Sequence, residues 1–122
     1  MIVFEAEDSD ALTDNRFNHS IGNGNELNGL TANDWGFVVP YSGEVISVTM
    51  GNRTTATTAS EFQLTFDGGL VGGVLSLPAN TSSQVWNVNQ NITAGQSINF
   101  YTLDGNNISD SAITIHVLIC AE

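Results

Sequence analysis

The residues that could do chemistry are few and scattered along the chain. There are two histidines, His19 and His116, and a single cysteine, Cys120. A nucleophilic triad needs a serine or cysteine beside a histidine and a carboxylate, but no serine stands in a G-x-S-x-G turn. Cys120 lies two residues from the end and has no second cysteine for an internal disulfide. We therefore expect a protein that is not an enzyme.

Metal binding has two candidate sites, and neither has a recognised ligand spacing. His116 alternates with apolar residues, so three copies of it could meet on a metal at a symmetry axis. The competing interpretation is an interface histidine with a hydrogen-bond partner. The acidic start, with Glu5, Glu7, Asp8 and Asp10, offers oxygen ligands for calcium but matches no calcium-loop pattern. We expect neither a metal nor a cofactor.

Charge excludes two classes of partner. The 122 residues include 13 carboxylates but only two cationic side chains, Arg16 and Arg53, so the net charge is −11. Nucleic-acid binding needs basic residues that displace counterions from phosphate, and anionic membranes are disfavoured for the same reason. No apolar run approaches the about 20 residues of a membrane span, and the acidic start lacks a secretory pattern. We expect a protein that binds neither nucleic acid nor membrane, and that is either made in the cytoplasm or exported by a signal that this sequence does not include.

Alternation of apolar and polar residues predicts β-strands from residue 35 onward. The cleanest case is 61–67, where Phe62, Leu64 and Phe66 alternate with polar residues. Further strands are expected at 35–39, 44–50, 70–77, 85–88, 98–103 and 112–120. Turn residues separate them at roughly 8–12-residue spacing, and we predict an all-β fold, an antiparallel β-sandwich (jelly roll) of about eight strands, in 35–122.

Glycine and asparagine predict the local features between these strands. Asp67-Gly68-Gly69 predicts a tight turn, because glycine adopts positive φ at no steric cost. Gly72 and Gly73 predict a bulge or bend within 70–77. The run 104–107, DGNN, predicts a turn between the last two strands.

Residues 1–34 differ from the rest of the chain. They are rich in Asp, Asn and Gly, and no helical period connects their few large apolar residues. We predict a long irregular N-terminal segment, in which 2–6 is a strand or an arm. A flexible terminus and a docking arm both remain open.

Two strands carry apolar or aromatic groups on both faces. Tyr101 and Leu103 lie on the second face of 98–103, and His116 and Leu118 on that of 112–120. We expect both strands in one sheet, whose outer face a second copy covers, so that these four residues form a trimer interface. The alternative is that residues 2–6 cover that face within one chain.

Four pieces of the region 36–119 form a pattern: FVVPYSGEVISVTM, EFQLTFDGG, NITAGQSINFYTLDG and AITIHVLI. In these pieces the region resembles the jelly-roll domains of the tumour-necrosis-factor and complement globular type. Gly95 and Gly105 occupy the family's turn positions around the penultimate strand, whereas Gln96 stands where many members have aspartate. The resemblance implies a trimeric β-sandwich.

Within that type, the small acidic chain is similar to capsid decoration (cement) proteins of tailed bacteriophages. This similarity implies a homotrimer on the outer capsid surface of the virion, where it binds the major capsid protein and stabilises the shell. Residues 1–34 would then dock on the capsid, and the candidate docking residues are Ile2, Val3, Phe4, Phe17 and Ile21.

The alternative function is a receptor- or carbohydrate-binding head domain of a phage fibre, or a lectin-like module. In that case the aromatic residues Trp35, Tyr41, Trp86 and Tyr101 would stack on sugars if they are exposed. Packing in the core or in an interface is the competing interpretation of these four side chains.

Overall fold

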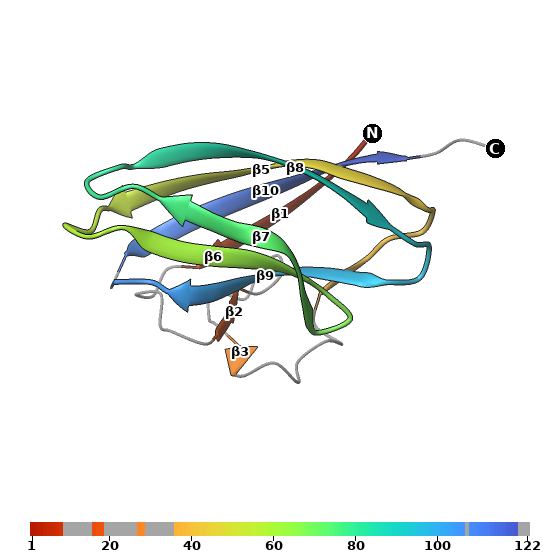
Figure 1. The fold of residues 1–122 in the computed structure, drawn as a ribbon, viewed down its shortest axis with the longest axis horizontal. Coiled ribbons are helices and arrows are strands. Elements are labelled where there is room, and N and C mark those ends of the chain that lie inside the picture. The colour runs from red at the N-terminus through yellow and green to blue at the C-terminus, as the bar shows by residue number, and fades with distance from the viewer. Residues whose placement is uncertain (9–15, 19–26, 29–35, 107, 120–122) are drawn as a thin grey trace.

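The structure, a computed structural model, describes residues 1–8, 16–18, 27–28, 36–106 and 108–119. These residues form ten strands in two facing sheets (Figure 1). The strands are β1 (Ile2–Asp8), β2 (Arg16–Asn18), β3 (Leu27–Asn28), β4 (Phe37–Val38), β5 (Gly43–Thr54), β6 (Ser60–Phe66), β7 (Gly69–Leu77), β8 (Ser83–Ile92), β9 (Ser97–Asp104) and β10 (Ser109–Ile119). None of the described residues belongs to a helix long and apolar enough to cross a membrane.

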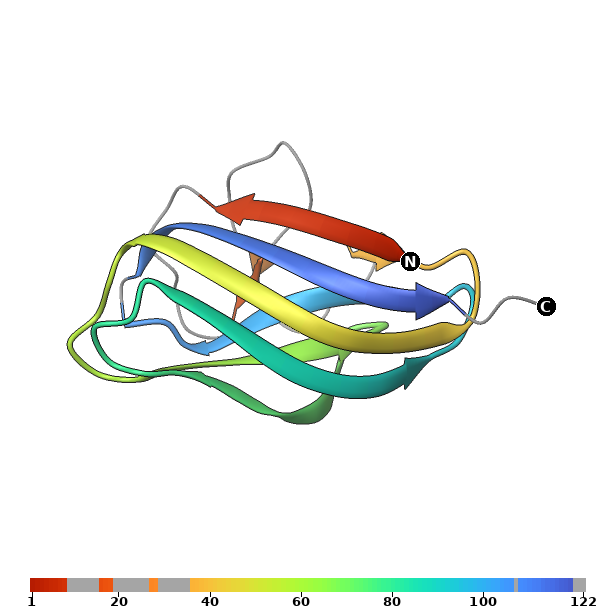
Figure 2. The ribbon, with the colours of Figure 1, turned by 90° about the horizontal axis from the view of Figure 1, so that it is seen from above.

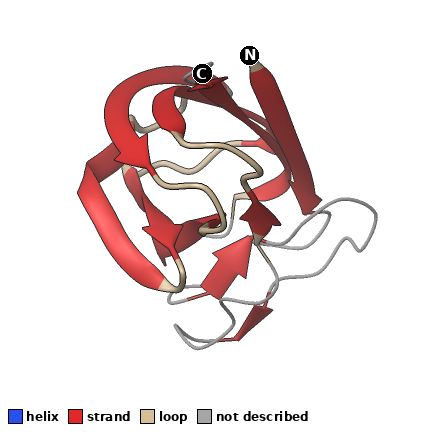
Figure 3. Cartoon of the chain, turned by 90° about the vertical axis from the view of Figure 1, so that its right-hand side faces the viewer, coloured by secondary structure: helices blue, strands red, loops and turns tan. Residues whose placement is uncertain are grey.

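The strand order is that of a jelly roll, which confirms the predicted fold class. One sheet runs β1-β10-β5-β8, seen from above in Figure 2, and the other runs β3-β2-β9-β6-β7. β6 pairs with one edge of β9. β2 and β4 pair with different parts of the opposite edge of β9. With β4 as the second strand, the layers β1-β10-β5-β8 and β4-β9-β6-β7 are the two halves of an eight-strand jelly roll. Figure 3 shows the two layers end-on.

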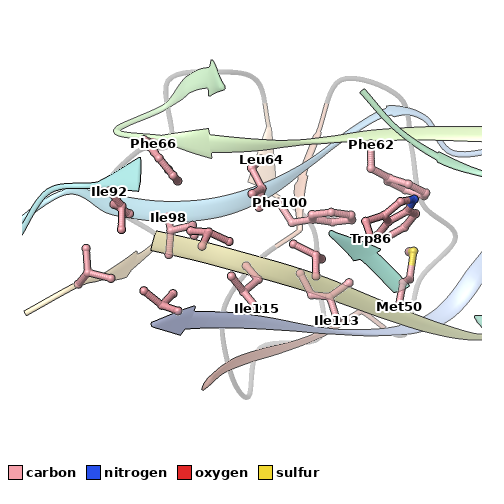
Figure 4. Packing of buried hydrophobic residues seen from close by; sticks show 14 of the residues in the cluster. Met50, Phe62, Leu64, Phe66, Trp86, Ile92, Ile98, Phe100, Ile113 and Ile115 are labelled. Carbon is pink, nitrogen blue, oxygen red and sulfur yellow. The ribbon is translucent and has the colours of Figure 1, made fainter. Parts of the chain in front are cut away.

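The hydrophobic core lies between the two sheets, where the predicted alternation puts it. On β6 and β9, Leu64 pairs with Phe100 and Phe66 with Ile98, and all four side chains are buried. Figure 4 shows Phe100 beside Phe62 and Trp86 in the core. The ring centroid of Phe62 lies 5.2 Å from that of Phe100 and 6.2 Å from that of Trp86. Aromatic rings at such distances attract one another beyond the area they bury.

Two side-chain contacts close the long sides of the sandwich. On one side, the indole N–H of Trp86 on β8 donates to the carbonyl oxygen of Ser76 on β7, at 2.9 Å. On the other side, the ring of Phe4 on β1 stacks on that of Phe37 on β4, with centroids 4.7 Å apart. Each contact joins one sheet to the other.

The predicted tight turn and bulge are both confirmed. Asp67 and Gly68 have φ angles of 51° and 81°, as the hairpin turn between β6 and β7 requires. In the β6–β7 register, Phe62 pairs with Leu75 but Leu64 pairs with Val71, so β7 carries extra residues around Gly72. The side-chain amide of Gln63 donates to the Gly72 carbonyl oxygen at 2.7 Å and fills this gap.

The prediction that the last two strands share a sheet is wrong. β9 belongs to the sheet of β6 and β7, whereas β10 lies between β1 and β5 in the opposite sheet. The turn residues between them lead from one layer to the other, and Ile108 is buried on the way. Turn chemistry is local, so the same residues serve a hairpin or a crossing between sheets.

The N-terminal segment is predicted to be irregular apart from a strand or arm at 2–6, and the structure shows more regular structure than that. Residues Ile2–Asp8 form a regular edge strand that pairs with β10 along its whole length, so the sandwich begins at Ile2 rather than at residue 35. β2 and β3 add short strands to the other sheet. The rest of the predicted segment, 9–15, 19–26 and 29–34, lies outside the described residues.

Candidate functional site

The outer face of the four-stranded sheet carries two of the residues that the sequence analysis proposed for an interface. On β10, Ile115 and Val117 are buried, so His116 and Leu118 point away from the core. Val3 of β1 pairs with His116 on one side, and Ser47 of β5 on the other. Leu118 is 50% exposed and Val3 is 47% exposed. We call Val3, Ser47, His116 and Leu118 the outer-face patch.

Several side chains of this face are hydrogen-bonded to one another, but the carboxylates of Glu5 and Glu44, which pair in register with Thr114 and Leu118, also lie on it. Ser47 Oγ and His116 Nδ1 lie 3.2 Å apart, and the hydroxyls of Thr49 and Thr114 pair across the same two strands. A polar group that already has a partner costs little when a second molecule covers it. The outer face therefore combines exposed apolar side chains and hydrogen-bonded hydroxyl groups with two carboxylates, which a second copy would cover or leave at the rim.

The four predicted interface residues are not brought together. His116 and Leu118 lie on the outer-face patch, whereas Tyr101 and Leu103 lie on β9 in the other sheet. Tyr101 is only 3% exposed in a single copy, and this burial raises the pKa of its hydroxyl. Tyr101 therefore needs no second copy to cover it, and residues 2–6, which lie in the opposite sheet as β1, are not its cover either. Leu103 is half-buried.

The candidate docking residues are also divided. Ile2 and Phe4 are half-buried on β1, and Phe4 is engaged with Phe37, whereas Val3 points to solvent on the outer-face patch. Phe17 pairs with Tyr101 through the backbone of β2 and β9. Ile21 lies outside the described residues. Of these five, Val3 is the one that the structure shows exposed.

Two of the four aromatic residues proposed for sugar stacking are buried within the fold. Trp86 and Tyr101 are buried, as the competing packing interpretation predicts, and Trp35 lies outside the described residues. Tyr41, in the turn between β4 and β5, is 64% exposed. Stacking on a sugar therefore rests on Tyr41 within the described part of the chain.

The described residues hold no group of three or more His, Cys, Asp and Glu side chains that could bind a metal. The contact found for His116 is the hydroxyl of Ser47. His19, Asp10 and Cys120, which the sequence also raised as candidates, lie outside the described residues.

A second surface is marked by a sequence signal that strand-by-strand interpretation misses. No charged residue occurs between Gly68 and Leu103, although the rest of the chain carries 13 carboxylates and two arginines. This run forms β7 and β8, the edge strands of the two sheets, which lie side by side (Figure 2). We call the side of the sandwich formed by β7 and β8 the neutral flank.

The neutral flank exposes apolar side chains and has charge only at its margins. Val74 of β7 and Val85 of β8 are 50% and 61% exposed, and each points outward from its own sheet at this side of the sandwich, since their neighbours Leu75 and Trp86 face the core. Among the described neighbours in register, Glu61 lies beside Ser76 and Glu44 beside Asn91. An uncharged centre with a charged rim is the usual anatomy of a protein–protein interface.

No family model and no curated protein matches the chain. Among solved structures, it is similar to the crystal structure of Podospora anserina GH26-CBM35 beta-(1,4)-mannanase, with a TM-score of 0.53 and 14% sequence identity. The match covers 98% of this chain and 28% of the mannanase chain. At that identity the likeness concerns the fold alone, and it agrees with the β-sandwich described above.

Proposed function

We propose that this chain is a non-enzymatic structural protein that forms a homotrimer through the outer face of its four-stranded sheet and decorates a larger shell. The observation that carries the proposal is the outer-face patch, where Val3 and Leu118 stand half-exposed around His116. Apolar groups gathered on one sheet face favour burial against another protein surface. A second copy of the chain is the simplest partner in the oligomers that proteins commonly form.

The finer part of the proposal is a capsid decoration protein on the outside of a phage virion. It rests on the resemblance of the sequence to that class, and on a net charge of −11, which disfavours nucleic acid and membranes as partners. The mechanism is multivalent clamping: three linked subunits each make a modest contact with the major capsid protein, and the linkage multiplies their effect.

The association is expected to tighten as salt is added. Each copy carries a net charge of −11, so copies repel one another at low ionic strength. Salt shortens the Debye length from about 30 Å at 0.01 M to about 8 Å at physiological strength, which weakens that repulsion. Sedimentation velocity over a salt series measures the effect. An association constant that stays flat or falls with salt would show that attraction between charges holds the copies together.

Binding to a shell is tested by co-sedimentation with capsids that lack their decoration protein. Removal of residues 1–34 is a poor test, because it deletes β1 and with it Val3 and the edge partner of β10. The variant Val3→Ser keeps the strand and removes only the exposed apolar group. If Val3 contributes to docking, this variant binds the capsid more weakly; unchanged capsid binding would limit Val3 to contacts between subunits.

The second candidate function is a carbohydrate-binding module. Two observations favour it: Tyr41 is 64% exposed at one end of the sandwich, and the fold is similar to part of a chain named as a GH26-CBM35 beta-(1,4)-mannanase. Affinity electrophoresis in soluble β-1,4-mannan tests this candidate. Retardation that is lost in Tyr41→Ala would support it, and unretarded migration of the wild-type chain would remove this polysaccharide as a ligand.

A further inference from the structure

We propose that the neutral flank is a second self-association surface, on which β8 of one copy pairs with the antiparallel β8 of another copy about a two-fold axis. The proposal does not depend on the outer-face trimer, because it rests on the side of the sandwich and on a different set of contacts. It commits to a second copy of this chain as the occupant.

The first step is electrostatic. Two molecules that each carry a net charge of −11 repel wherever their carboxylates come close. The run from Gly68 to Leu103 has no charged residue, so β7 and β8 form a side by which two copies can approach with no carboxylate of either strand in contact. A basic partner would gain no attraction from this flank, whereas a second acidic copy avoids repulsion there.

The second step concerns the free edge of β8. The Val85 carbonyl oxygen accepts a hydrogen bond from the neighbouring side-chain amide of Gln84, at 3.3 Å, so it points away from β5. In an antiparallel strand the N–H and C=O of a residue point the same way and alternate along the chain. Val85 and Asn87 therefore present backbone donors and acceptors at the edge of the sheet.

The third step is that β8 lacks the usual protection of an edge. Natural edge strands carry lysine, proline, inward charges or bulges that prevent pairing with another chain. β8 has the sequence SQVWNVNQNI, with no charge and no proline. Its protections are the side-chain amide of Gln84, which bonds the edge carbonyl of Val85 at 3.3 Å and must move aside, and the irregularity at Asn89, where φ is 54° and the register with β5 shifts. The regular part, 83–88, remains available for pairing.

An antiparallel edge is self-complementary, since the same strand rotated by a two-fold axis offers matching donors and acceptors. Pairing would also bring the β7 strands of the two copies toward each other, and with them Val74, which is 50% exposed. A carboxylate introduced at Val74, which points outward from β7 beside this edge, would then lie near the same carboxylate of the second copy.

The test uses a Leu118→Glu background, which disables the outer-face patch and leaves the flank. We expect this variant to show a monomer–dimer equilibrium in sedimentation equilibrium. Addition of Val74→Glu is expected to weaken that dimer by about a hundredfold or more, because like charges across an interface are strongly unfavourable. The matched control is Thr58→Glu, which adds the same charge in the exposed loop between β5 and β6 and leaves the dimer unchanged.

Hydrogen exchange on the wild-type chain provides a readout that needs no variant. The amides of Val85 and Asn87 are expected to gain protection as the protein concentration rises, while the amide of Trp86, which faces β5, does not change. A Leu118→Glu protein that stays monomeric at its highest soluble concentration, with no concentration-dependent protection of Val85, overturns the flank pairing and leaves the outer-face trimer standing. Conversely, if the wild-type chain forms dimers that Val74→Glu dissociates and Leu118→Glu leaves intact, the outer-face trimer is contradicted and the flank pairing is supported.

Discussion

Replacement of Trp86 by alanine is expected to lower the free energy of unfolding by about 3–5 kcal/mol, the range for removal of a large aromatic side chain from a core. Trp86 packs against Phe62 and Phe100, with ring centroids 6.2 Å and 6.1 Å away. Its indole N–H also donates a hydrogen bond to the Ser76 carbonyl oxygen of β7. The substitution therefore leaves a cavity in the core and also removes the hydrogen bond between β8 and β7, the edge strands of the two sheets.

Chemical denaturation followed by circular dichroism measures this loss. Trp86→Phe separates the two contributions, because it keeps an aromatic ring and removes the hydrogen bond, for which we expect a loss of about 1 kcal/mol. Val85→Ala, on the solvent side of the same strand, is the matched control and is expected to stay within about 0.5 kcal/mol of the wild type. A Trp86→Ala protein as stable as the control would show that this side chain does not close the sandwich.

Replacement of Leu118 by glutamate is expected to weaken trimer formation through the outer-face patch by about a hundredfold or more. Leu118 lies on the outer-face patch beside Glu44, with which it pairs in register. A second carboxylate at this position would have to be buried beside Glu44, and the one arginine in the described strands of this sheet, Arg53, lies at the far end of β5. Neither charge would find a partner within the interface.

The association constant of Leu118→Glu is measured by sedimentation velocity beside that of Thr58→Glu, which carries the same added charge away from the patch. Leu118 is half-exposed, so the substitution is expected to leave the unfolding midpoint of the single copy nearly unchanged. Equal weakening in both variants would trace the effect to net charge rather than to the patch.

The strands of the sandwich could be predicted because their cause is local. Phe62, Leu64 and Phe66 alternate with polar residues, and the sheet that buries them needs no more than this period of two. The turn at Asp67-Gly68 and the bulge at Gly72 were equally predictable, since each depends on a backbone conformation that its own residues favour.

The assignment of strands to layers could not be predicted in the same way. Alternation states that Tyr101 and Leu118 point away from the core, but not which sheet each strand joins. The structure places the two strands in opposite layers and buries Tyr101 within a single copy. Tyr101 and Leu103 are therefore not part of the same surface as His116 and Leu118. His116 and Leu118 lie instead beside Val3 of β1, a strand from the other end of the sequence.

The neutral flank, by contrast, has a signal in the sequence that alternation of apolar and polar residues does not detect. A strand-by-strand interpretation asks which residues alternate and does not ask where charge is missing. The absence of charge from Gly68 to Leu103 acquires meaning once the fold shows that β7 and β8 are neighbouring edges. Charge distribution along a chain therefore merits the same scrutiny as its apolar period.

The mass of the wild-type particle in solution tests the central claim most directly. Native mass spectrometry and sedimentation at physiological salt are predicted to show a species of three times the chain mass of 13.0 kDa, which Leu118→Glu dissociates. A wild-type chain that remains a 13.0-kDa monomer at every concentration and salt strength would contradict the account, because the exposed outer-face patch would then have no second copy to cover it.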